Sequence, residues 1–539
     1  MLVKSVVGPK QVSVMKEYRI KISRYNPEVD DRPILKEYKV PCIEQGTVLE
    51  ALQFVYEEID STLLFNYGCR YKVCGKCAIK IGGKPGLACD TPLEDNMVLE
   101  PLDNFPVIRD LSVDRSGLLE PLRKHDILLS STKETKVAIQ PPEFFQLVKC
   151  NECLACFSNC PVFAQGVGYD GPFFGVKLTE LYYDVRDEKN RLGQLESYLN
   201  QCILCKQCGV DCPWDVDFSR IITRVLGELN KQKGISIRDW LISHPCLIGS
   251  FANFSPLFFN FFTKDKLVRK MLDRLMKIDE RAPFPKYRAS KIKPQKRKEN
   301  REKRKVAYFL GCYDKFYDPT KTKSSLFVLD SNNVKIKMLD LGCCGLPLIG
   351  IGKLESAKKR AITISRELEK LILDDYDIII SCTSCGAMIK NEYPTLFNQL
   401  EGKGFQSRIY DIGNYLWQMY KSNELNINFK EIRMRIGYHV PCHLKVQKIG
   451  KPFVNLLGLI PGLEIKEVFE KCCGMAGTMG LKKEKFDLSK KVGNPLINEV
   501  KDSRLDFILS DCPSCRMRIE KEAVVKTLHP ISILSESMQ

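Results

Sequence analysis

All but two of the 24 cysteines in this 539-residue chain fall into groups with a defined spacing. We expect no secretory signal in the N-terminal stretch MLVKSVVGPKQVSV, which is short and is interrupted by glycine and proline. Thiols in a chain that is not secreted stay reduced, so metal binding is favoured over a disulfide framework. Five histidines accompany the cysteines, and this ratio favours iron–sulfur clusters over mixed zinc sites.

The first group lies in CRYKVCGKCAIKIGGKPGLAC and has the spacing C-x4-C-x2-C-x11-C. Its first part is typical of plant-type [2Fe–2S] proteins. A tight loop would present three thiolates, and a hairpin at Gly82 and Gly83 would return the chain to supply the fourth. A structural zinc knuckle is the competing interpretation. The predicted [2Fe–2S] ligands are Cys69, Cys74, Cys77 and Cys89.

Two further runs, which begin at Cys150 and Cys202, both read C-x2-C-x2-C-x3-C-P. In this ferredoxin pattern the fourth cysteine of each run binds the cluster of the other run. We therefore predict two cubane [4Fe–4S] clusters, one on Cys150, Cys153, Cys156 and Cys212, and one on Cys202, Cys205, Cys208 and Cys160. The two cysteines outside all groups, Cys42 and Cys246, are predicted to be buried small apolar residues.

The C-terminal region contains two copies of a five-cysteine pattern, because Cys442 follows Cys312 by 130 positions and the other cysteines repeat at nearly the same offset. Each copy contains an adjacent pair. A disulfide within such a pair is strained, since bridged Cα atoms prefer about 5.5–6 Å and consecutive ones lie about 3.8 Å apart. The two sets are Cys312, Cys343, Cys344, Cys382 and Cys385, and Cys442, Cys472, Cys473, Cys512 and Cys515.

Five thiols are one more than an ordinary cube requires, so each set suits an irregular iron–sulfur cluster in which neighbouring thiolates bind different irons. A zinc site that uses three or four of the five thiols is a competing interpretation. For the two C-x2-C pairs, a thioredoxin-like redox site is another.

The cysteines of both copies end short apolar strands, such as VAYFLGC and YDIIISC, and helical segments such as 356–373 intervene. This alternation predicts an α/β sheet with ligands at the strand ends. Nearer the N-terminus, residues 18–25 and 36–41 are predicted strands, and Thr47 is the predicted N-cap of an amphipathic helix.

The formal net charge is +17, and residues 286–305 alone contain eleven Lys or Arg and two Glu. This run lies between two cysteine-rich regions, so an exposed linker is favoured over a nucleic-acid-binding arm. Residues 243–263 lack formal charge but contain two prolines. We predict a core or subunit interface there, with a membrane-surface contact as the alternative, no integral membrane anchor and a cytoplasmic location.

Three resemblances cover nearly the whole chain. The segments RYNPEVDDRP and LEPLDNFPVIRDLSVD, with the cysteine loop between them, resemble the iron–sulfur subunit of succinate dehydrogenase and fumarate reductase. The middle region is similar to the helical ferredoxin domain of that subunit. However, Cys205 completes a cubane where that family usually has a [3Fe–4S] centre beside a quinone, and in this detail the region resembles the ferredoxin-type subunit of heterodisulfide reductase.

The motifs YFLGC, GCCG, SCTSC, PCH, KCCG and DCPSC resemble the CCG domains of heterodisulfide reductase, which hold noncubane [4Fe–4S] clusters. The combination of such domains with an N-terminal region of the fumarate reductase type resembles the iron–sulfur subunit of the methanogen CoM/CoB thiol:fumarate reductases. This resemblance implies a multidomain α+β and α/β fold. Its parts are a β-grasp [2Fe–2S] ferredoxin domain (1–110), an α-helical ferredoxin domain with two [4Fe–4S] clusters (111–285), a basic linker (286–305), and two CCG domains (306–425 and 426–539).

The resemblance also implies an oxidoreductase that converts fumarate and the thiols of coenzyme M and coenzyme B into succinate and the heterodisulfide CoM-S-S-CoB. In this chain, two noncubane clusters would oxidise the thiols, and the cubanes and the [2Fe–2S] cluster would pass electrons to FAD on a flavoprotein partner. The chain has no G-x-G-x-x-G motif after a strand, so FAD and fumarate are expected on the partner. No nucleic-acid partner and no separate mononuclear metal site are expected.

Among the non-cysteine residues, His443 is the candidate catalytic residue, as a proton donor or acceptor beside Cys442. His439 could instead cap a strand or, if a site holds zinc, bind that metal. Lys445, Lys448 and Arg516 are candidates to attract the anionic coenzymes. The competing functions are a heterodisulfide reductase subunit, a glycolate- or lactate-oxidising iron–sulfur subunit, a quinone-linked succinate dehydrogenase subunit, and an electron-transfer adaptor without a substrate site.

Overall fold

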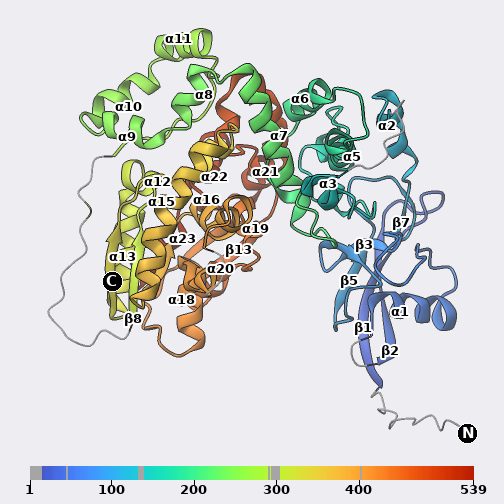
Figure 1. Cartoon of the computed structure of the whole chain (residues 1–539). Helices are drawn as coiled ribbons and strands as arrows, with labels where there is room; N and C mark the ends of the chain where they lie inside the picture. The colour runs from blue at the N-terminus through green and yellow to red at the C-terminus, as the bar shows by residue number, and fades with distance from the viewer. Residues whose placement is uncertain (1–14, 44–45, 131–138, 289–291, 293–303, 401–403) are drawn as a thin grey trace, which may run out of the picture. The chain divides into compact units, whose positions relative to one another are not determined.

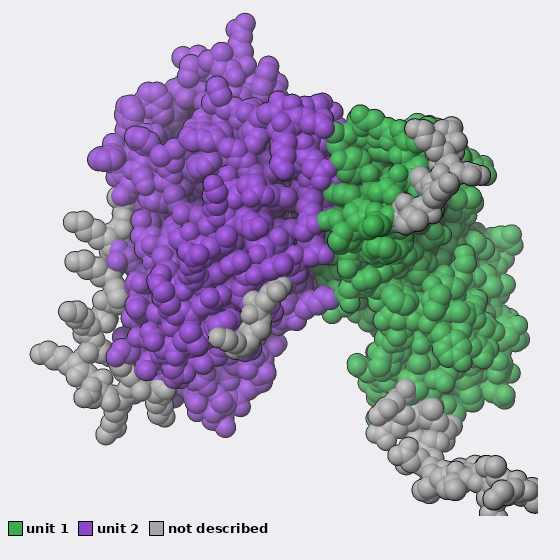
Figure 2. Space-filling view, in the orientation of Figure 1, with its two compact units in different colours: residues 1–195, 207–219 green, residues 196–206, 220–539 purple. Residues whose placement is uncertain are grey.

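The computed structural model describes residues 15–43, 46–130, 139–288, 292, 304–400 and 404–539 (Figure 1). The chain divides into two compact units (Figure 2). Unit 1 comprises residues 1–195 and 207–219, and unit 2 comprises residues 196–206 and 220–539. The mixed α and β composition that the sequence predicts is confirmed. Most of the predicted basic linker, 286–305, lies outside the described residues, and the predicted domain boundaries stay predictions.

Unit 1 contains a five-stranded sheet in which the predicted strands 18–25 and 36–41 are found as the first two strands. The strand β1 pairs antiparallel with β2 and parallel with β5, while β3 pairs antiparallel with both β4 and β5. The sheet order is β2-β1-β5-β3-β4. The strands are β1 (Met15–Arg24), β2 (Ile34–Ile43), β3 (Ala78–Ile81), β4 (Lys84–Leu87) and β5 (Met97–Glu100), with a separate pair β6 (Val107–Arg109) and β7 (Ser112–Val113).

The helix α1 (Val48–Phe54) packs against this sheet and starts where the sequence predicts. The Thr47 Oγ1 atom accepts the Glu50 N–H at 3.3 Å, and the Glu50 carboxylate accepts the Thr47 N–H at 2.6 Å, which forms a complete capping box. The helices that follow in this part of the chain are α2 (Leu119–Lys124), α3 (Pro142–Leu147), α4 (Ala155–Ser158), α5 (Gly171–Tyr183) and α6 (Leu192–Gln201).

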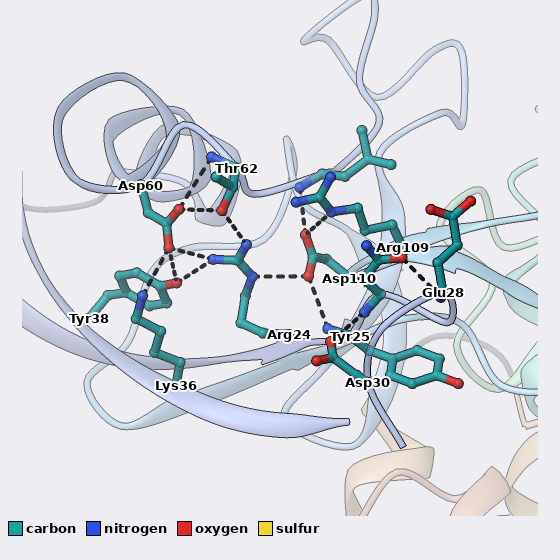
Figure 3. A network of polar contacts seen from close by, with 12 residues as sticks. Arg24, Tyr25, Glu28, Asp30, Lys36, Tyr38, Asp60, Thr62, Arg109 and Asp110 are labelled. Atoms are coloured by element: carbon teal, nitrogen blue, oxygen red, sulfur yellow. Dashed lines mark hydrogen bonds and ion pairs between the residues drawn. The ribbon is translucent and has the colours of Figure 1, made fainter. Parts of the chain in front are cut away.

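A polar network fastens β1 to the loops of the sheet (Figure 3). The Arg24 guanidinium donates to Asp60 at 2.6 Å and to Asp110 at 2.9 Å, and it also donates to the Tyr38 hydroxyl at 2.6 Å. The side chains of Arg24, Asp60 and Asp110 are only 12%, 13% and 2% exposed. Asp60 also pairs with Lys36 at 2.9 Å and Asp110 with Arg109 at 3.8 Å, but Arg24 is the least exposed of these cations and the one that both carboxylates share.

Replacing Arg24 by methionine is expected to lower the free energy of unfolding by about 3 kcal/mol, because two largely buried carboxylates lose the buried cation that they share. Hydrogen bonds from Thr62, Lys36 and Tyr38, as well as from Arg24, lower the pKa of Asp60. A carboxyl with a lowered pKa stabilises the fold at pH values above its unfolded pKa of about 4. This contribution is lost as the pH falls from there through the folded pKa. The difference between wild type and Arg24→Met in chemical denaturation should therefore shrink in acid.

The matched control is Lys39→Met, since Lys39 lies 3.9 Å from Glu17 in an ion pair whose two side chains are both more than half exposed. Such a pair contributes at most about 1 kcal/mol. Equal losses of stability in the Arg24 and Lys39 variants would contradict the role given to the network.

Unit 2 contains two four-stranded parallel sheets with the same topology, in the orders β11-β10-β8-β9 and β13-β12-β14-β15. Residues 306–309 of the central strand β8 are at most 1% exposed, as expected for parallel strands covered on both faces. The strands are β8 (Arg304–Phe309), β9 (Val334–Leu339), β10 (Asp377–Ile380) and β11 (Ile409–Asp411), then β12 (Met434–His439), β13 (Leu463–Phe469), β14 (Phe507–Leu509) and β15 (Lys526–Leu528).

The two sheets share one hydrophobic core, to which Tyr308 of the first and Tyr438 of the second contribute as fully buried side chains. The helices of the two copies are α12 (Cys312–Phe316), α13 (Pro319–Ser331), α14 (Leu346–Ile349), α15 (Leu354–Leu373), α16 (Thr383–Ala387), α17 (Tyr393–Phe397) and α18 (Ile412–Lys421), then α19 (Cys442–Val446), α20 (Pro452–Leu457), α21 (Lys483–Ser503), α22 (Pro513–Ala523) and α23 (Pro530–Ser537).

The segment 243–263 forms two helices within the run α7 (Phe218–Lys233), α8 (Ile237–Ile242), α9 (Pro245–Ala252), α10 (Pro256–Lys264) and α11 (Lys266–Met276). The prediction of a core is wrong for much of it, because Phe254, Leu257 and Phe261 are 91%, 85% and 70% exposed. Among the described residues, no single helix is long and apolar enough to cross a membrane. The helices α9 and α10 together have the required length and apolar composition, but the chain bends by 112° between them. The predicted interface stays a prediction.

Candidate iron–sulfur centres

The loop between α1 and β3 brings the four predicted [2Fe–2S] ligands together. Each thiol of Cys69 and Cys74 accepts the backbone N–H of the other, at 3.3 and 3.4 Å. The Cys77 thiol hydrogen-bonds to that of Cys89 and interacts with that of Cys74. Backbone N–H groups of Tyr71 and Cys74 lower the pKa of Cys69 to about 7. Backbone donors therefore favour the thiolate at Cys69, the form that binds iron, whereas burial raises the pKa of Cys77 to about 12.

The hairpin that returns Cys89 to the loop has the geometry expected from the sequence. Gly82 and Gly83 have φ angles of +56° and +79° between β3 and β4. A two-residue turn with both φ values positive suits glycine, because other side chains clash with the backbone there.

A second group of thiols lines an apolar cavity in unit 1. Cys150, Cys153, Cys156 and Cys212 surround it with Cys208, and Phe173, Val176 and Phe218 close its walls. The Cys156 thiol interacts with the other four thiols, and burial raises its pKa and raises that of Cys153 to about 11. Thiols in such a dry site become thiolates only where metal charge compensates them.

The [2Fe–2S] loop and this cavity are adjacent. A Cβ atom on Gly75 would lie 2.6 Å from the Asn151 carbonyl oxygen and 2.8 Å from the Cys153 Cα, so only glycine permits this approach. The side chains of Asn151 and Trp214 both donate to the Lys72 carbonyl oxygen, at 3.0 and 3.1 Å. Unit 1 therefore places the two sites side by side, as one-electron transfer between them requires.

Arg115 lies between these two sites, since its guanidinium interacts with the thiols of Cys74 and Cys77 on one side and of Cys153 on the other. Its Nε is buried and has no hydrogen-bond partner among the described residues. A buried cation with unused donors beside two sets of thiols fits the net negative charge of iron–sulfur clusters.

Replacing Arg115 by methionine is expected to lower the reduction potentials of both neighbouring clusters by about 40 mV each, equivalent to about 1 kcal/mol. A nearby cation stabilises the reduced state of a cluster because that state carries more negative charge. EPR-monitored redox titration measures both potentials. The exposed Arg123→Met should change neither, and an unchanged potential in the Arg115 variant would contradict this role.

The other predicted cubane set is divided between the units: Cys160 and Cys208 belong to unit 1, and Cys202 and Cys205 belong to unit 2. This ligand set stays a prediction. Within unit 2, the Cys205 thiol interacts with that of Cys472, a member of the second five-cysteine set.

The first five-cysteine set is gathered at the carboxyl ends of β8, β9 and β10. Its thiols form a continuous hydrogen-bonded chain in the order Cys312, Cys343, Cys344, Cys385 and Cys382. Four of the five residues are buried, and Cys312 is partly exposed. The strand ends thus collect five residues that are up to 73 positions apart along the sequence.

The second set repeats this arrangement at the ends of β12, β13 and β14. The thiols of Cys472, Cys473, Cys515 and Cys512 form the hydrogen-bonded chain, and Cys442 interacts with Cys473 and Cys512. The turn after the adjacent pair requires glycine, because Gly474 has φ +78° and a Cβ there would lie 2.0 Å from the Ser489 carbonyl oxygen on α21.

Each set has a buried cation beside it. The fully buried Arg518 interacts with Cys473, and its Nε has no hydrogen-bond partner in the described part of the chain. At the first set, the buried Lys321 interacts with Cys382 and forms an ion pair with Asp314. Five thiols and a cation fit an anionic iron–sulfur cluster. No group of His, Cys, Asp or Glu in the described residues is arranged to hold a single metal ion.

The predicted catalytic residue His443 connects the two sets. Its Nδ1 lies 2.8 Å from the Ser384 hydroxyl, which is between Cys382 and Cys385 of the first set, while His443 itself follows Cys442 of the second. Burial and the nearby Lys206 lower the pKa of His443 to about 4. The imidazole is therefore neutral near pH 7, and its surroundings disfavour the protonated form.

His439 has a structural position, since its ring nitrogens lie 3.1 Å from the Ser510 hydroxyl and 3.1 Å from the Lys471 carbonyl oxygen at the end of β12. Of the three basic candidates, Lys445 pairs with Glu470 at 3.1 Å and Lys448 is exposed. Arg516 is buried and donates to Asp318 at 2.8 Å.

Arg516 also lines a cavity of about 430 Å³ in unit 2 that the sequence does not indicate. The cavity wall includes residues adjacent to both sets: Tyr313 follows Cys312, and Arg516 follows Cys515. The Nε and Nη2 atoms of Arg516 are buried and have no hydrogen-bond partner among the described residues. The other basic residues of the wall are Lys264, Arg269, Lys286, Arg288 and Lys521.

Sequence reasoning missed Arg115, Arg518, Ser384 and this cavity. Neither arginine belongs to a spacing motif, and Ser384 stands out only as a residue within a C-x2-C pair. A basic cavity assembled from α10, α12, α22 and the segment 283–288 has no local signature at all.

Three family descriptions match successive parts of the chain. A 2Fe-2S iron-sulfur cluster binding domain matches residues 19–120, and a 4Fe-4S dicluster domain matches residues 146–216. A cysteine-rich domain, CCG, matches residues 306–390 and 436–520, which cover the first three strands of each parallel sheet of unit 2.

Other proteins combine the same domains. A fumarate reductase (CoM/CoB) subunit of Methanothermobacter marburgensis is 28% identical over 96% of this chain and 98% of its own length. A subunit of the anaerobic glycerol-3-phosphate dehydrogenase of Escherichia coli is 31% identical over 72% of this chain and 98% of its own length. A fumarate reductase iron-sulfur subunit of E. coli is 34% identical over 40% of this chain and 95% of its own length. The chain therefore belongs to the iron–sulfur electron-transfer subunits of fumarate reductases and related dehydrogenases, in the arrangement found in fumarate reductase (CoM/CoB).

Proposed function

We propose that this chain is the thiol-oxidising and electron-transferring subunit of a cytoplasmic thiol:fumarate reductase. Coenzyme M and coenzyme B thiols would lose two electrons and two protons to form CoM-S-S-CoB. A FAD-containing partner would add two electrons and two protons to fumarate to form succinate. The observation that carries this proposal is the pair of complete five-thiol sets in unit 2, joined through His443 and Ser384.

The site residues we propose as cluster ligands are the 22 cysteines of the groups described above: four for one [2Fe–2S] cluster, eight for two cubane [4Fe–4S] clusters and ten for two noncubane [4Fe–4S] clusters. When bound, a cluster at each five-thiol set would lower the pKa of a substrate thiol and accept one electron at a time. Serial clusters suit the chemistry because a disulfide is a two-electron couple while iron–sulfur centres change by one electron.

The protein's own residues bind the substrates and take up a proton. The cavity with Arg516 presents unused guanidinium donors next to both sets, which suits anionic thiols. We place the proton acceptor at His443 because it lies between the two sets, where Ser384 holds the ring in position. Two electrons would leave through the second set, whose Cys472 interacts with Cys205 of the predicted cubane.

The test is an anaerobic titration of the purified complex with coenzyme M and coenzyme B, followed by EPR, by iron quantitation and by mass spectrometry of the heterodisulfide. We expect new EPR signals from the five-thiol sets and stoichiometric CoM-S-S-CoB when fumarate is present. Zinc in both sets, or spectra that the thiols do not change, would overturn the proposal.

A second candidate is an electron-transfer adaptor for a flavoprotein dehydrogenase, because the glycerol-3-phosphate dehydrogenase subunit matches most of this chain. The same titration distinguishes the two. An adaptor would be reduced by the dehydrogenase substrate through its flavoprotein, and the coenzyme thiols would leave its five-thiol sets unchanged.

A further inference from the structure

A sixth thiol lies at the first five-cysteine set. Cys246, predicted from the sequence to be a small buried apolar residue, is instead partly exposed and hydrogen-bonds through its thiol to the thiol of Cys312. It also interacts with the Cys343 thiol and hydrogen-bonds to the Cys343 backbone. The hydrogen-bonded chain at this site therefore begins at Cys246 and contains six sulfur atoms.

Close packing between helices holds Cys246 there. It lies in the first turn of α9, and one turn later Gly249 meets α12, where a Cβ would lie 2.5 Å from the Phe316 ring. On the other side, Gly342 has φ +77°, and its Cβ position lies 3.6 Å from the Cys246 Sγ. Gly249 thus allows α9 to approach the Cys312 helix closely, and the Cys246 thiol lies against the turn that carries the adjacent pair.

The same place has a cation to compensate an additional thiolate. The Arg360 Nε donates to the Cys343 carbonyl oxygen at 3.0 Å, and the Arg360 Nη2 lies 2.6 Å from the position a Gly342 Cβ would take. The guanidinium interacts with both Cys246 and Cys343. The pocket therefore combines a spare sulfur with a positive charge.

The second set is different in this respect. The thiol beyond its five cysteines is that of Cys205, which belongs to a ferredoxin run and is a proposed cubane ligand. Cys246 belongs to no such run. It is therefore available to the first set alone, and the two otherwise repeated sites become chemically unequal.

We propose that Cys246 is an additional sulfur ligand of the iron–sulfur cluster held by the first five-cysteine set, an inference that rests on the function proposed above. An extra thiolate adds negative charge, which disfavours reduction. The first cluster then has the lower reduction potential, and an electron released there moves to the second set, the one that contacts Cys205. The sixth ligand thus sets the direction in which electrons move between the two clusters.

The experiment compares wild type with Cys246→Ser and Cys246→Ala in the full chain, prepared anaerobically. We expect each variant to change the Mössbauer and EPR parameters of one noncubane cluster and to raise the reduction potential of that cluster, while the other cluster keeps its values. Cys42→Ser is the matched control, because Cys42 is the other cysteine outside the groups and is buried in the unit 1 core. It should leave every cluster parameter unchanged.

A second measurement needs no variant. In iron-loaded wild type, Cys246 should resist alkylation by iodoacetamide, and it should react after the iron is removed with a chelator, as mass spectrometry of the peptides would show. Rapid alkylation of Cys246 in the loaded protein, or unchanged cluster parameters in a loaded Cys246 variant, would overturn the inference while the proposed function stands. Absence of iron from both sets of wild type would overturn both.

Discussion

The Cys473→Ser variant is expected to lose heterodisulfide formation by at least about 100-fold, while the [2Fe–2S] spectrum of the same protein stays intact. Cys473 is the centre of the second set, because its thiol hydrogen-bonds to those of Cys472 and Cys515 and interacts with the buried Arg518. A serine hydroxyl is a poor ligand for iron, and it removes the thiolate charge beside this buried cation, which also pairs with Glu522 at 3.8 Å.

The measurement combines iron content with turnover of coenzyme M, coenzyme B and fumarate by the complex. Cys42→Ser again serves as the control for a cysteine-to-serine change at a buried site away from the sets. Full turnover in the Cys473 variant would show that the second set is not the thiol-oxidising site. Loss of all cluster signals together would show that the change simply unfolds the chain.

The Cys74→Ser variant should separate thiol oxidation from fumarate reduction. The [2Fe–2S] loop depends on the paired Cys69 and Cys74, and Cys77 interacts with Cys74 as well. Loss of this cluster interrupts the route to the flavoprotein, so thiol-dependent fumarate reduction should fall below detection. Addition of both thiols should still change the EPR signals of the five-thiol sets, because these lie in unit 2.

Tyr71→Phe tests the same loop without touching a ligand, since the Tyr71 side chain is exposed and its backbone N–H still donates to the Cys69 thiol. This variant should retain fumarate reduction. Electron delivery to fumarate by the Cys74 variant would mean that electrons reach the flavin by a route that does not use the [2Fe–2S] cluster.

Some parts of the fold could be predicted because the relevant interactions are local. The capping box at Thr47 and Glu50 and the hairpin at Gly82 and Gly83 each involve residues within a few positions of one another. The two parallel sheets could also be predicted, because the apolar strands that end in cysteines recur at a constant offset.

Other predictions failed for lack of long-range information. The segment 243–263 reads as a core segment by composition, yet Phe254 and Leu257 are exposed, since whether an apolar helix is covered depends on distant elements. Cys246 reads as an isolated cysteine, yet α9 packs on α12 and brings it to Cys312.

By itself, the amino-acid sequence determined how the cysteines are grouped along the chain and so predicts which thiols share a cluster, because ligand spacing within a run is a local property of the chain. Tertiary structure alone decided what surrounds them: the cations Arg115 and Arg518, the contact of His443 with Ser384, and the sixth thiol of Cys246. The physical reason is that the electrostatic surroundings of a site come from residues far apart in sequence, which only the packing of helices and strands brings into contact.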